Sequence, residues 1–173
     1  MKGNKGQIVE ILPDSPLYKA EKKQFLNRRE ALECESKRPK YGLFDGMLIG
    51  GHDGVENYKI GQRKGLDIGG KKEPLYIIDI DEKENRIFVG AGKNHPGLFT
   101  KALFIPNSKI EWFENIDYLK KKSDTPVKVH IVIKGKEEVL QANLYQYDDG
   151  YIVEFERYET ALPKHLILEI YFN

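Results

Sequence analysis

The chain has 173 residues, enough for one ordinary domain or two small ones. Apolar residues make up 40% of it and charged residues 32%, so the composition allows a packed core. The 28 Lys and Arg residues nearly balance the 27 Asp and Glu residues, giving a formal net charge of +1. This balance excludes nucleic-acid binding driven by overall charge, so any such binding must come from local basic patches.

Cys34 is the one cysteine, which excludes an internal disulfide and a cysteine-pair metal site. The four histidines lack the spacing of a metal-binding pair, so we expect no metal. No stretch approaches the roughly 20 apolar residues that span a bilayer, and the N-terminus lacks the apolar run of a secretory signal. We therefore expect a cytoplasmic protein with no membrane association.

The first part of the chain predicts one strand and one charged segment. Residues 6–12 are predicted to form a short strand, which two prolines end. Residues 17–40 show a weak helical spacing of four apolar side chains, Leu17, Phe25, Leu26 and Leu32. Interspersed glutamates leave two interpretations open, a solvated helix or a basic RNA contact built from Lys22, Lys23, Arg28, Arg29, Lys37, Arg38 and Lys40.

Residues 45–70 are rich in glycine. A short apolar strand, 47–49, lies between glycine-rich turns, and the close spacing of the next four glycines indicates tight turns or close backbone approach, at Gly61, Gly65, Gly69 and Gly70. The segment GQRKGLDIGG could also hold a phosphate through backbone N–H groups, Arg63 and Lys64. It lacks both the GK[ST] sequence and a strand–turn–helix setting, so the pattern favours turns.

From residue 75 the pattern is typical of β-structure. Segments 75–80 and 86–89 flank the polar turn DEKEN and predict a hairpin. Beyond residue 125, four alternating segments have strand length, and a DDG turn joins two of them. We predict a mainly β (α+β) fold in two domains, an α+β domain over 1–101 with a charged insertion at about 13–42, and a small antiparallel β-barrel or sandwich over 102–173.

No residue pattern indicates a complete catalytic site. Cys34 could act as a nucleophile only with help from a neighbouring cation, and the glutamates beside it oppose that, so an incidental thiol is favoured. His52 and His95 lie in turns, where we expect their side chains to hydrogen-bond loop backbone. We find no triad, paired-carboxylate site or nucleotide-activating loop, and assign no catalytic residue.

The segment HDGVENYKIGQRKGLDIGG, residues 52–70, resembles a signature of the tRNA-specific 2-thiouridylases. The family's histidine-glycine turn, tyrosine, IGQRKGL run and glycine pair all occur here in register. The likeness continues through Val89-Gly90, His95-Pro96 and Leu98-Phe99 to the last strands. It covers most of residues 43–173 and the early segment GQIVEI.

The resemblance implies a division of labour. Enzymes of this family have an ATP-using N-terminal domain with an SGGxDS loop and two cysteines, a small central domain, and a six-stranded β-barrel resembling the second domain of elongation factor Tu. This chain resembles the last two parts, which implies a non-catalytic tRNA-binding portion, inactive alone and without a cofactor of its own. Cys34 follows the GQIVEI strand, whereas the family's second catalytic cysteine precedes it, so no catalysis is assigned to Cys34. Expected partners are tRNA and a catalytic domain or sulfur-carrier protein.

The chain departs from the family at its RNA contacts. The family's arginine-tyrosine pair is absent from the strand 130–134, and the TPGQ turn is replaced by residues 162–165, with Pro163 kept. The candidate RNA contacts are basic side chains, each of which could equally be a solvated surface charge: Lys59, Arg63, Lys64, Lys134, Lys136, Lys164 and His165. The alternative is an interaction module that has lost its RNA contacts and binds a protein through barrel tyrosines, although a core role for those tyrosines is favoured.

Overall fold

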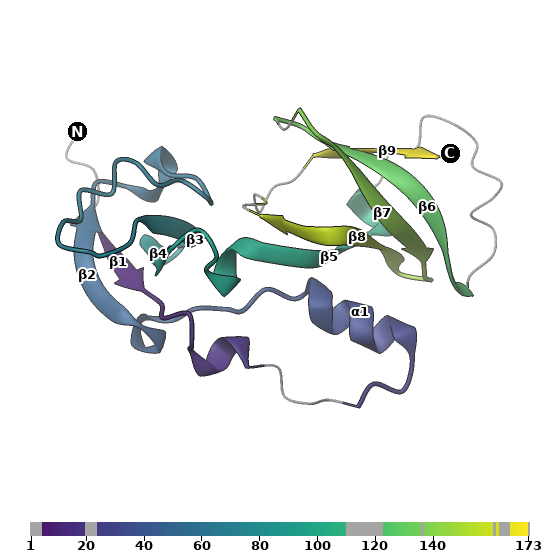
Figure 1. The fold of residues 1–173 in the computed structure, drawn as a ribbon, viewed down its shortest axis with the longest axis horizontal. Coiled ribbons are helices and arrows are strands. Elements are labelled where there is room, and N and C mark those ends of the chain that lie inside the picture. The colour runs from purple at the N-terminus through teal and green to yellow at the C-terminus, as the bar shows by residue number, and fades with distance from the viewer. Residues whose placement is uncertain are drawn as a thin grey trace. The chain divides into compact units, whose positions relative to one another are not determined.

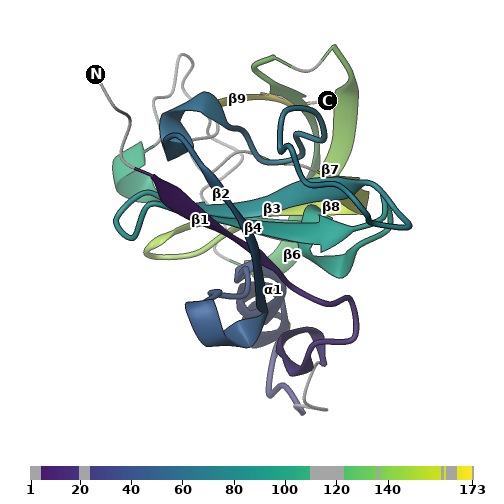
Figure 2. The same ribbon diagram turned by 90° about the vertical axis from the view of Figure 1, so that its left-hand side faces the viewer.

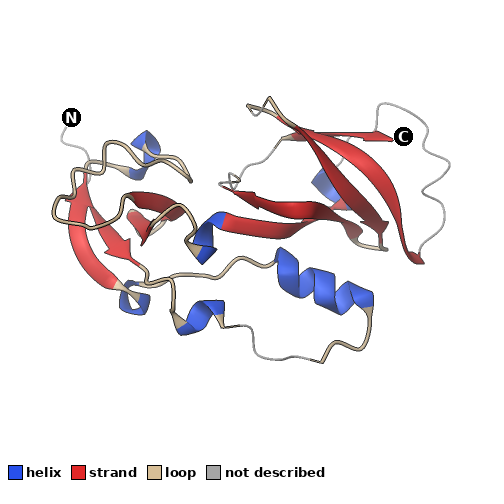
Figure 3. Cartoon of the chain, viewed as in Figure 1, coloured by secondary structure: helices blue, strands red, loops and turns tan. Residues whose placement is uncertain are grey.

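The computed structural model describes residues 5–19, 24–109, 123–135, 137–160, 162 and 167–172 (Figure 1). The chain divides into two compact units. Unit 1 comprises Met1–Lys22, Pro39–Phe99 and Thr160–Pro163, and unit 2 comprises Lys23–Arg38, Thr100–Glu159 and Lys164–Asn173. Strands dominate the described residues, which form two sheets and one α-helix (Figure 3), so the predicted mainly β fold is confirmed.

Unit 1 is built on a four-stranded sheet in the order β2-β1-β4-β3. The strands are β1 (Gly6–Glu10), β2 (Met47–His52), β3 (Leu75–Asp81) and β4 (Arg86–Ala91). β1 runs parallel to β4, and the other two pairs are antiparallel (Figure 2). The hairpin predicted around DEKEN is confirmed as β3–β4, with Asn85 in a left-handed conformation at φ 49°.

Both faces of this sheet are buried. Alternate side chains enter opposite cores, as strand geometry requires: Ile8 and Ile87 pack with Leu66, while Val9 and Phe88 pack with Leu98. The glycine-rich segment that follows β2 covers the first face. Tyr18, Tyr41 and Leu43 cover the second, so the two ends of the charged insertion are packed against unit 1.

Unit 2 holds a five-stranded sheet in the order β5-β8-β7-β6-β9 within the described residues. Its strands are β5 (Phe99–Pro106), β6 (Ser123–Ile133), β7 (Val139–Gln146), β8 (Gly150–Thr160) and β9 (Leu168–Phe172). The pairs β6–β7, β7–β8 and β6–β9 are antiparallel. Closure into a six-stranded barrel stays a prediction.

The sheet of unit 2 has a core face and an outer face. Val129, Ile131, Ala142, Leu144 and Phe155 are buried on the core face. The helix α1 (Arg28–Ser36) packs on the outer face, where Leu32 joins a cluster with Ala102, Tyr145 and Ile152. Figure 1 shows α1 on the β5–β8 side of the sheet, away from β9.

The charged insertion forms a shorter helix than its apolar spacing suggested. α1 begins after Asn27, whose side chain accepts a hydrogen bond from Glu30 N at 2.9 Å, and it buries only Leu32. Leu26, also part of the predicted apolar stripe, is 90% exposed. Residues 23–38 belong to unit 2, and the two units divide between Phe99 and Thr100.

Short 3-10 turns complete the described elements. They lie at Pro16–Tyr18, Leu43–Asp45, Val55–Asn57, Pro96–Leu98 and Asn107–Lys109. None of the described helices is long and apolar enough to cross a membrane.

Candidate nucleic-acid interface

The GQRKG loop, residues 58–67 of unit 1, has a fixed backbone. Gly61 and Gly65 adopt φ values of 84° and 82°, which only glycine reaches easily, so the predicted tight turns are confirmed there. Gly61 N donates to Ile77 O at 2.7 Å and Ile77 N donates to Gln62 O at 3.0 Å, which ties the loop to β3.

The side chain of Gln62 fastens the same loop from within. Its carbonyl oxygen accepts from Lys59 N at 3.0 Å, and its amide donates to Lys64 O at 2.9 Å. Because these bonds hold the backbone on both sides of Arg63, the loop presents its basic side chains from a defined scaffold.

Lys59, Arg63 and Lys64 are exposed, and none of them forms a salt bridge within the described part of the chain. Other basic residues are neutralised by nearby carboxylates, namely Arg28, Arg29, Lys71, Arg86 and Arg157. The three loop cations are therefore available to an external anion such as a phosphate.

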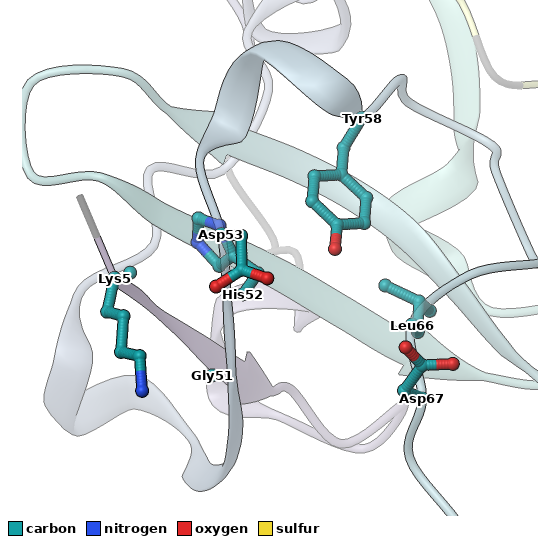
Figure 4. A pocket seen from close by; sticks show the side chains of 8 residues that line it. Lys5, Gly51, His52, Asp53, Tyr58, Leu66 and Asp67 are labelled. Carbon is teal, nitrogen blue, oxygen red and sulfur yellow. The ribbon is translucent and has the colours of Figure 1, made fainter. Parts of the chain in front are cut away.

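A cavity of about 340 Å³ lies where the GQRKG loop begins and ends (Figure 4). Its lining includes Lys5, His52, Asp53, Tyr58, Leu66 and Asp67. The rings of His52 and Tyr58 meet edge to face, with centroids 5.5 Å apart. Burial and the negative charges of Asp67 and Asp53 raise the pKa of Tyr58, so its hydroxyl stays protonated at neutral pH.

His52 and His95 have the backbone-bonding roles predicted for them. His52 Nδ1 accepts from Gly54 N at 3.1 Å, and His95 Nδ1 accepts from Gly97 N at 3.2 Å. Both side chains are buried. These bonds confirm structural roles in turns for both residues.

The exposed part of the outer face of unit 2 combines aromatic and basic side chains. His130 on β6 lies directly opposite Tyr171 on β9 and Gln141 on β7, and opposed residues of antiparallel strands share a face. Lys128 lies two residues before His130 on β6, Lys134 directly follows the end of β6 and donates its backbone N–H to Ile167 O at 2.9 Å, and Tyr171 is 52% exposed. We call this set, Lys128, His130, Lys134 and Tyr171, the β6–β9 face. On such a surface a base can stack on an aromatic ring while a neighbouring lysine contacts its phosphate.

The candidates named from the sequence included Lys134 but not its neighbours on the β6–β9 face. The alternation in VKVHIVIK already places Lys128, His130 and Lys134 on one side of a strand. Tyr171 could not be added, because its place depends on the pairing register of β9 with β6.

Two arginines of α1 are committed to contacts inside unit 2. Arg28 donates to the carboxylate of Glu154, which also accepts from Tyr145 Oη at 2.9 Å. Arg29 bonds both carboxylate oxygens of Asp149, at 2.9 and 2.8 Å. Because these arginines hold the helix on the sheet, they are less available for the RNA contact that one interpretation of the insertion assigned to them.

Glu154 is a buried carboxylate kept ionised by its partners. Burial alone raises its pKa, but the hydrogen bonds from Arg28 and Tyr145 outweigh that effect, and the pKa falls below its usual value. Arg28 and Arg29 also lie over the rings of Tyr145 and Tyr147, at 5.9 and 4.8 Å from the ring centroids.

The remaining candidates are distributed as follows. Lys136, Lys164 and His165 lie outside the described residues. Lys59, Arg63 and Lys64 share one loop of unit 1, while Lys134 lies in unit 2. Cys34 is an exposed thiol, and the described residues contain no cluster of His, Cys, Asp and Glu that could hold a metal ion.

The chain matches the family model described as the tRNA methyl transferase PRC-barrel domain over residues 24–91. The matched residues include α1 and the strands β2, β3 and β4 of the four-stranded sheet. Among curated proteins it is similar to the tRNA-specific 2-thiouridylase MnmA of Flavobacterium johnsoniae, with 36% identity over 92% of this chain and 40% of that protein. The corresponding protein of Christiangramia forsetii is 33% identical over 100% of this chain and 43% of its own length.

The MnmA protein of Karelsulcia muelleri is 36% identical over 98% of this chain and 41% of its own length. The chain thus spans well under half the length of these relatives. Over nearly its whole length it is similar to one part of the tRNA-specific 2-thiouridylases.

Proposed function

We propose that this chain is the non-catalytic, tRNA-binding portion of a tRNA-specific 2-thiouridylase that thiolates the wobble uridine. The names of the relatives support tRNA as the partner. In this proposal the sulfur chemistry and its ATP belong to a separate catalytic domain, the chain is inactive alone, and it works in the cytoplasm.

The observation that favours RNA binding is the set of unpaired cations on the GQRKG loop. Lys59, Arg63 and Lys64 project from a backbone fixed by Gln62, without carboxylate partners in the described part of the chain. Phosphate contacts of this kind position a nucleic acid without reading its sequence. The β6–β9 face adds two further lysines and the rings of His130 and Tyr171, although the Tyr171 hydroxyl donates to the exposed carboxylate of Glu169.

The test measures the affinity of the full chain for unmodified tRNA across a salt series. Replacing Lys59, Arg63 and Lys64 together by Ala is expected to weaken binding at least tenfold and to flatten the dependence of log K on log salt by about 2 units, because about three phosphate contacts are lost. The matched control replaces three exposed lysines elsewhere in unit 1 by Ala, namely Lys72, Lys83 and Lys93. Equal losses in the two triple variants would show that only net charge matters and would reject the loop as an RNA contact.

A second candidate function is a protein-binding module whose partner is a separate catalytic domain or a sulfur-carrier protein. Its supporting observation is a group of exposed apolar side chains at the β2 edge of the described sheet, Leu12, Phe44, Met47 and Leu48. Phe44 is 98% exposed and Met47 63%. Exposed apolar groups beside an edge strand are typical of a protein contact. The tyrosines considered earlier fit less well, because Tyr145 and Tyr151 are buried.

The two functions are distinguished by one pair of measurements. A protein-binding module should bind tRNA weakly at every salt concentration and should bind the separately produced remainder of a full-length relative. The double variant F44S/M47S should abolish that binding and leave tRNA affinity unchanged. Unchanged binding of the double variant would reject the β2 edge as the contact.

A further inference from the structure

We propose that the cavity beside the GQRKG loop binds a single unstacked RNA base and prefers guanine to uracil. The inference rests on the proposed function, because it assumes an RNA whose phosphates lie against the loop. It assigns a specific ligand to a cavity that the phosphate contacts alone leave unexplained.

The course of the chain joins the cavity to the loop cations. The backbone leaves the cavity at Tyr58, presents Lys59, Arg63 and Lys64 to solvent, and returns to the cavity at Leu66. In this proposal, a nucleotide whose phosphate contacts the loop places its base in the cavity that the same loop borders. The bonds of Gln62 keep this arrangement in place before RNA arrives.

The lining selects a base over a phosphate. Figure 4 shows the hydroxyl of Tyr58 and the carboxylates of Asp53 and Asp67 bordering one space, with Leu66 beside it. Two carboxylates repel a phosphate but accept hydrogen bonds from ring N–H and amino groups. Leu66 and the ring of Tyr58 provide apolar surface for a planar base.

Among the bases, guanine fits these acceptors well. It presents two adjacent donors, the ring N1–H and the exocyclic amine, which can bond one carboxylate in parallel. Uracil presents one N–H between two carbonyl oxygens, which the carboxylates disfavour. The cavity volume, about 340 Å³, lies at the small end of the range for ligand pockets, which suits a single base.

The other charged and buried groups at the cavity agree with a neutral base. Lys5 also lines the cavity and is exposed, and it supplies one positive charge against the two carboxylates. His52 acts as a wall, because its Nδ1 is bonded to Gly54 N and its Nε2 is shielded from solvent. A side chain on Gly6 would clash with that ring, since a Cβ there would lie 2.3 Å from His52 Nε2.

The test compares guanosine and uridine monophosphates as probes of the full chain, with binding followed by NMR shifts of residues around the cavity. We expect the guanine nucleotide to bind about tenfold more tightly, the discrimination typical of a bidentate contact. The variants D53N and D67N should reduce the ratio toward one. The control D14N changes an exposed aspartate of unit 1 that does not line the cavity, and it should leave the ratio unchanged.

The remaining outcomes either overturn the base pocket or separate it from the proposed function. Equal binding of the two nucleotides, or tighter binding of spermidine than of either, would overturn the base pocket. An equal loss of discrimination in D14N would also overturn it, because the effect would then be one of charge alone. If tRNA binds with the salt dependence described above but the nucleotides are not distinguished, this inference fails and the proposed function stands. If the nucleotides are distinguished but tRNA does not bind, the proposed function fails and the pocket stands.

Discussion

The imidazole of His95 lies 3.0 Å from the carbonyl oxygen of Ile11, joining the turn after β4 to the end of β1. Because Nδ1 accepts from Gly97 N, the ring proton is on Nε2 and is donated to Ile11. The side chain is almost fully buried and meets the ring of Tyr18 edge to face. A neutral histidine therefore holds one of the two cores of unit 1 together.

This histidine predicts a loss of stability in mild acid. Burial lowers the pKa of His95, although its bond to Ile11 and the charge of Glu10 oppose the shift. The unfolded chain, with a pKa of about 6.5, then takes up a proton before the folded chain does. Stability is full above that value and declines as the pH falls from there toward the folded pKa. Thermal unfolding from pH 8 to pH 5 should show this decline.

Two variants locate the source of the pH dependence. H95Q removes the titrating group and should flatten the profile between pH 6.5 and 5, at the expense of lower stability throughout. H130Q changes a histidine on the partly exposed outer face of unit 2 and should preserve the profile. A profile unaltered in H95Q would mean that another group is responsible.

The packing of the His95 ring predicts that position 90 must be occupied by glycine. A Cβ added at Gly90 would lie 2.4 Å from the ring of His95, closer than real Cβ atoms approach a neighbour. The ring is fixed by its two hydrogen bonds, so the clash cannot be relieved by a simple rotation. We expect G90A to destabilise unit 1 by about 1–3 kcal/mol, the usual cost of overpacking.

The matched control for this substitution is G69A. Nothing lies within 4 Å of a Cβ at Gly69, and its φ is outside the left-handed range. G69A should therefore leave the denaturation midpoint unchanged or raise it slightly, because Ala reduces the entropy of the unfolded chain. Similar losses for both variants would contradict the steric explanation.

The contact between Arg28 and Glu154 predicts that α1 can be loosened selectively. R28A removes one donor from a buried carboxylate that keeps Tyr145 and Asn143 as partners. We expect a loss of about 1 kcal/mol, at the low end for a charged hydrogen bond because the Arg28 side chain is 40% exposed. The amides of α1 should exchange faster with solvent in this variant.

R157A is the control for that experiment. Arg157 pairs with the exposed Glu138 and with the buried Glu159, and neither residue belongs to α1, so its loss should leave the exchange of α1 unchanged. If α1 were held mainly by Leu32, R28A and R157A would behave alike.

Local sequence signals predicted the strands well. Alternation between apolar and polar residues, with the turns DEKEN and DDG, was enough to place β3, β4, β7 and β8, because strand period and turn chemistry are local properties. The glycines of the GQRKG loop likewise indicated tight turns, and Gly61 and Gly65 have the positive φ values of such turns.

The tertiary contacts could not be predicted in the same way. Arg28 and Glu154 are 126 residues apart, and no periodicity reveals that a charged helix is anchored by ion pairs instead of an apolar stripe. The β6–β9 face similarly depends on Tyr171 lying opposite His130, which is a matter of strand register.

Gln62 is predicted to support RNA binding without touching RNA. Its side chain bonds the backbone at Lys59 and Lys64, so Q62A should free the loop while leaving all three cations present. The cost of ordering those side chains would then fall on the binding step, and affinity for tRNA should drop several-fold. The slope of affinity against salt should not change, because the number of available charges is the same.

Hydrogen exchange should quicken at residues 59–65. Q24A, at an exposed glutamine of unit 2, provides the control for amide loss. Faster exchange in Q62A combined with wild-type affinity would show that a fixed loop is not needed for binding.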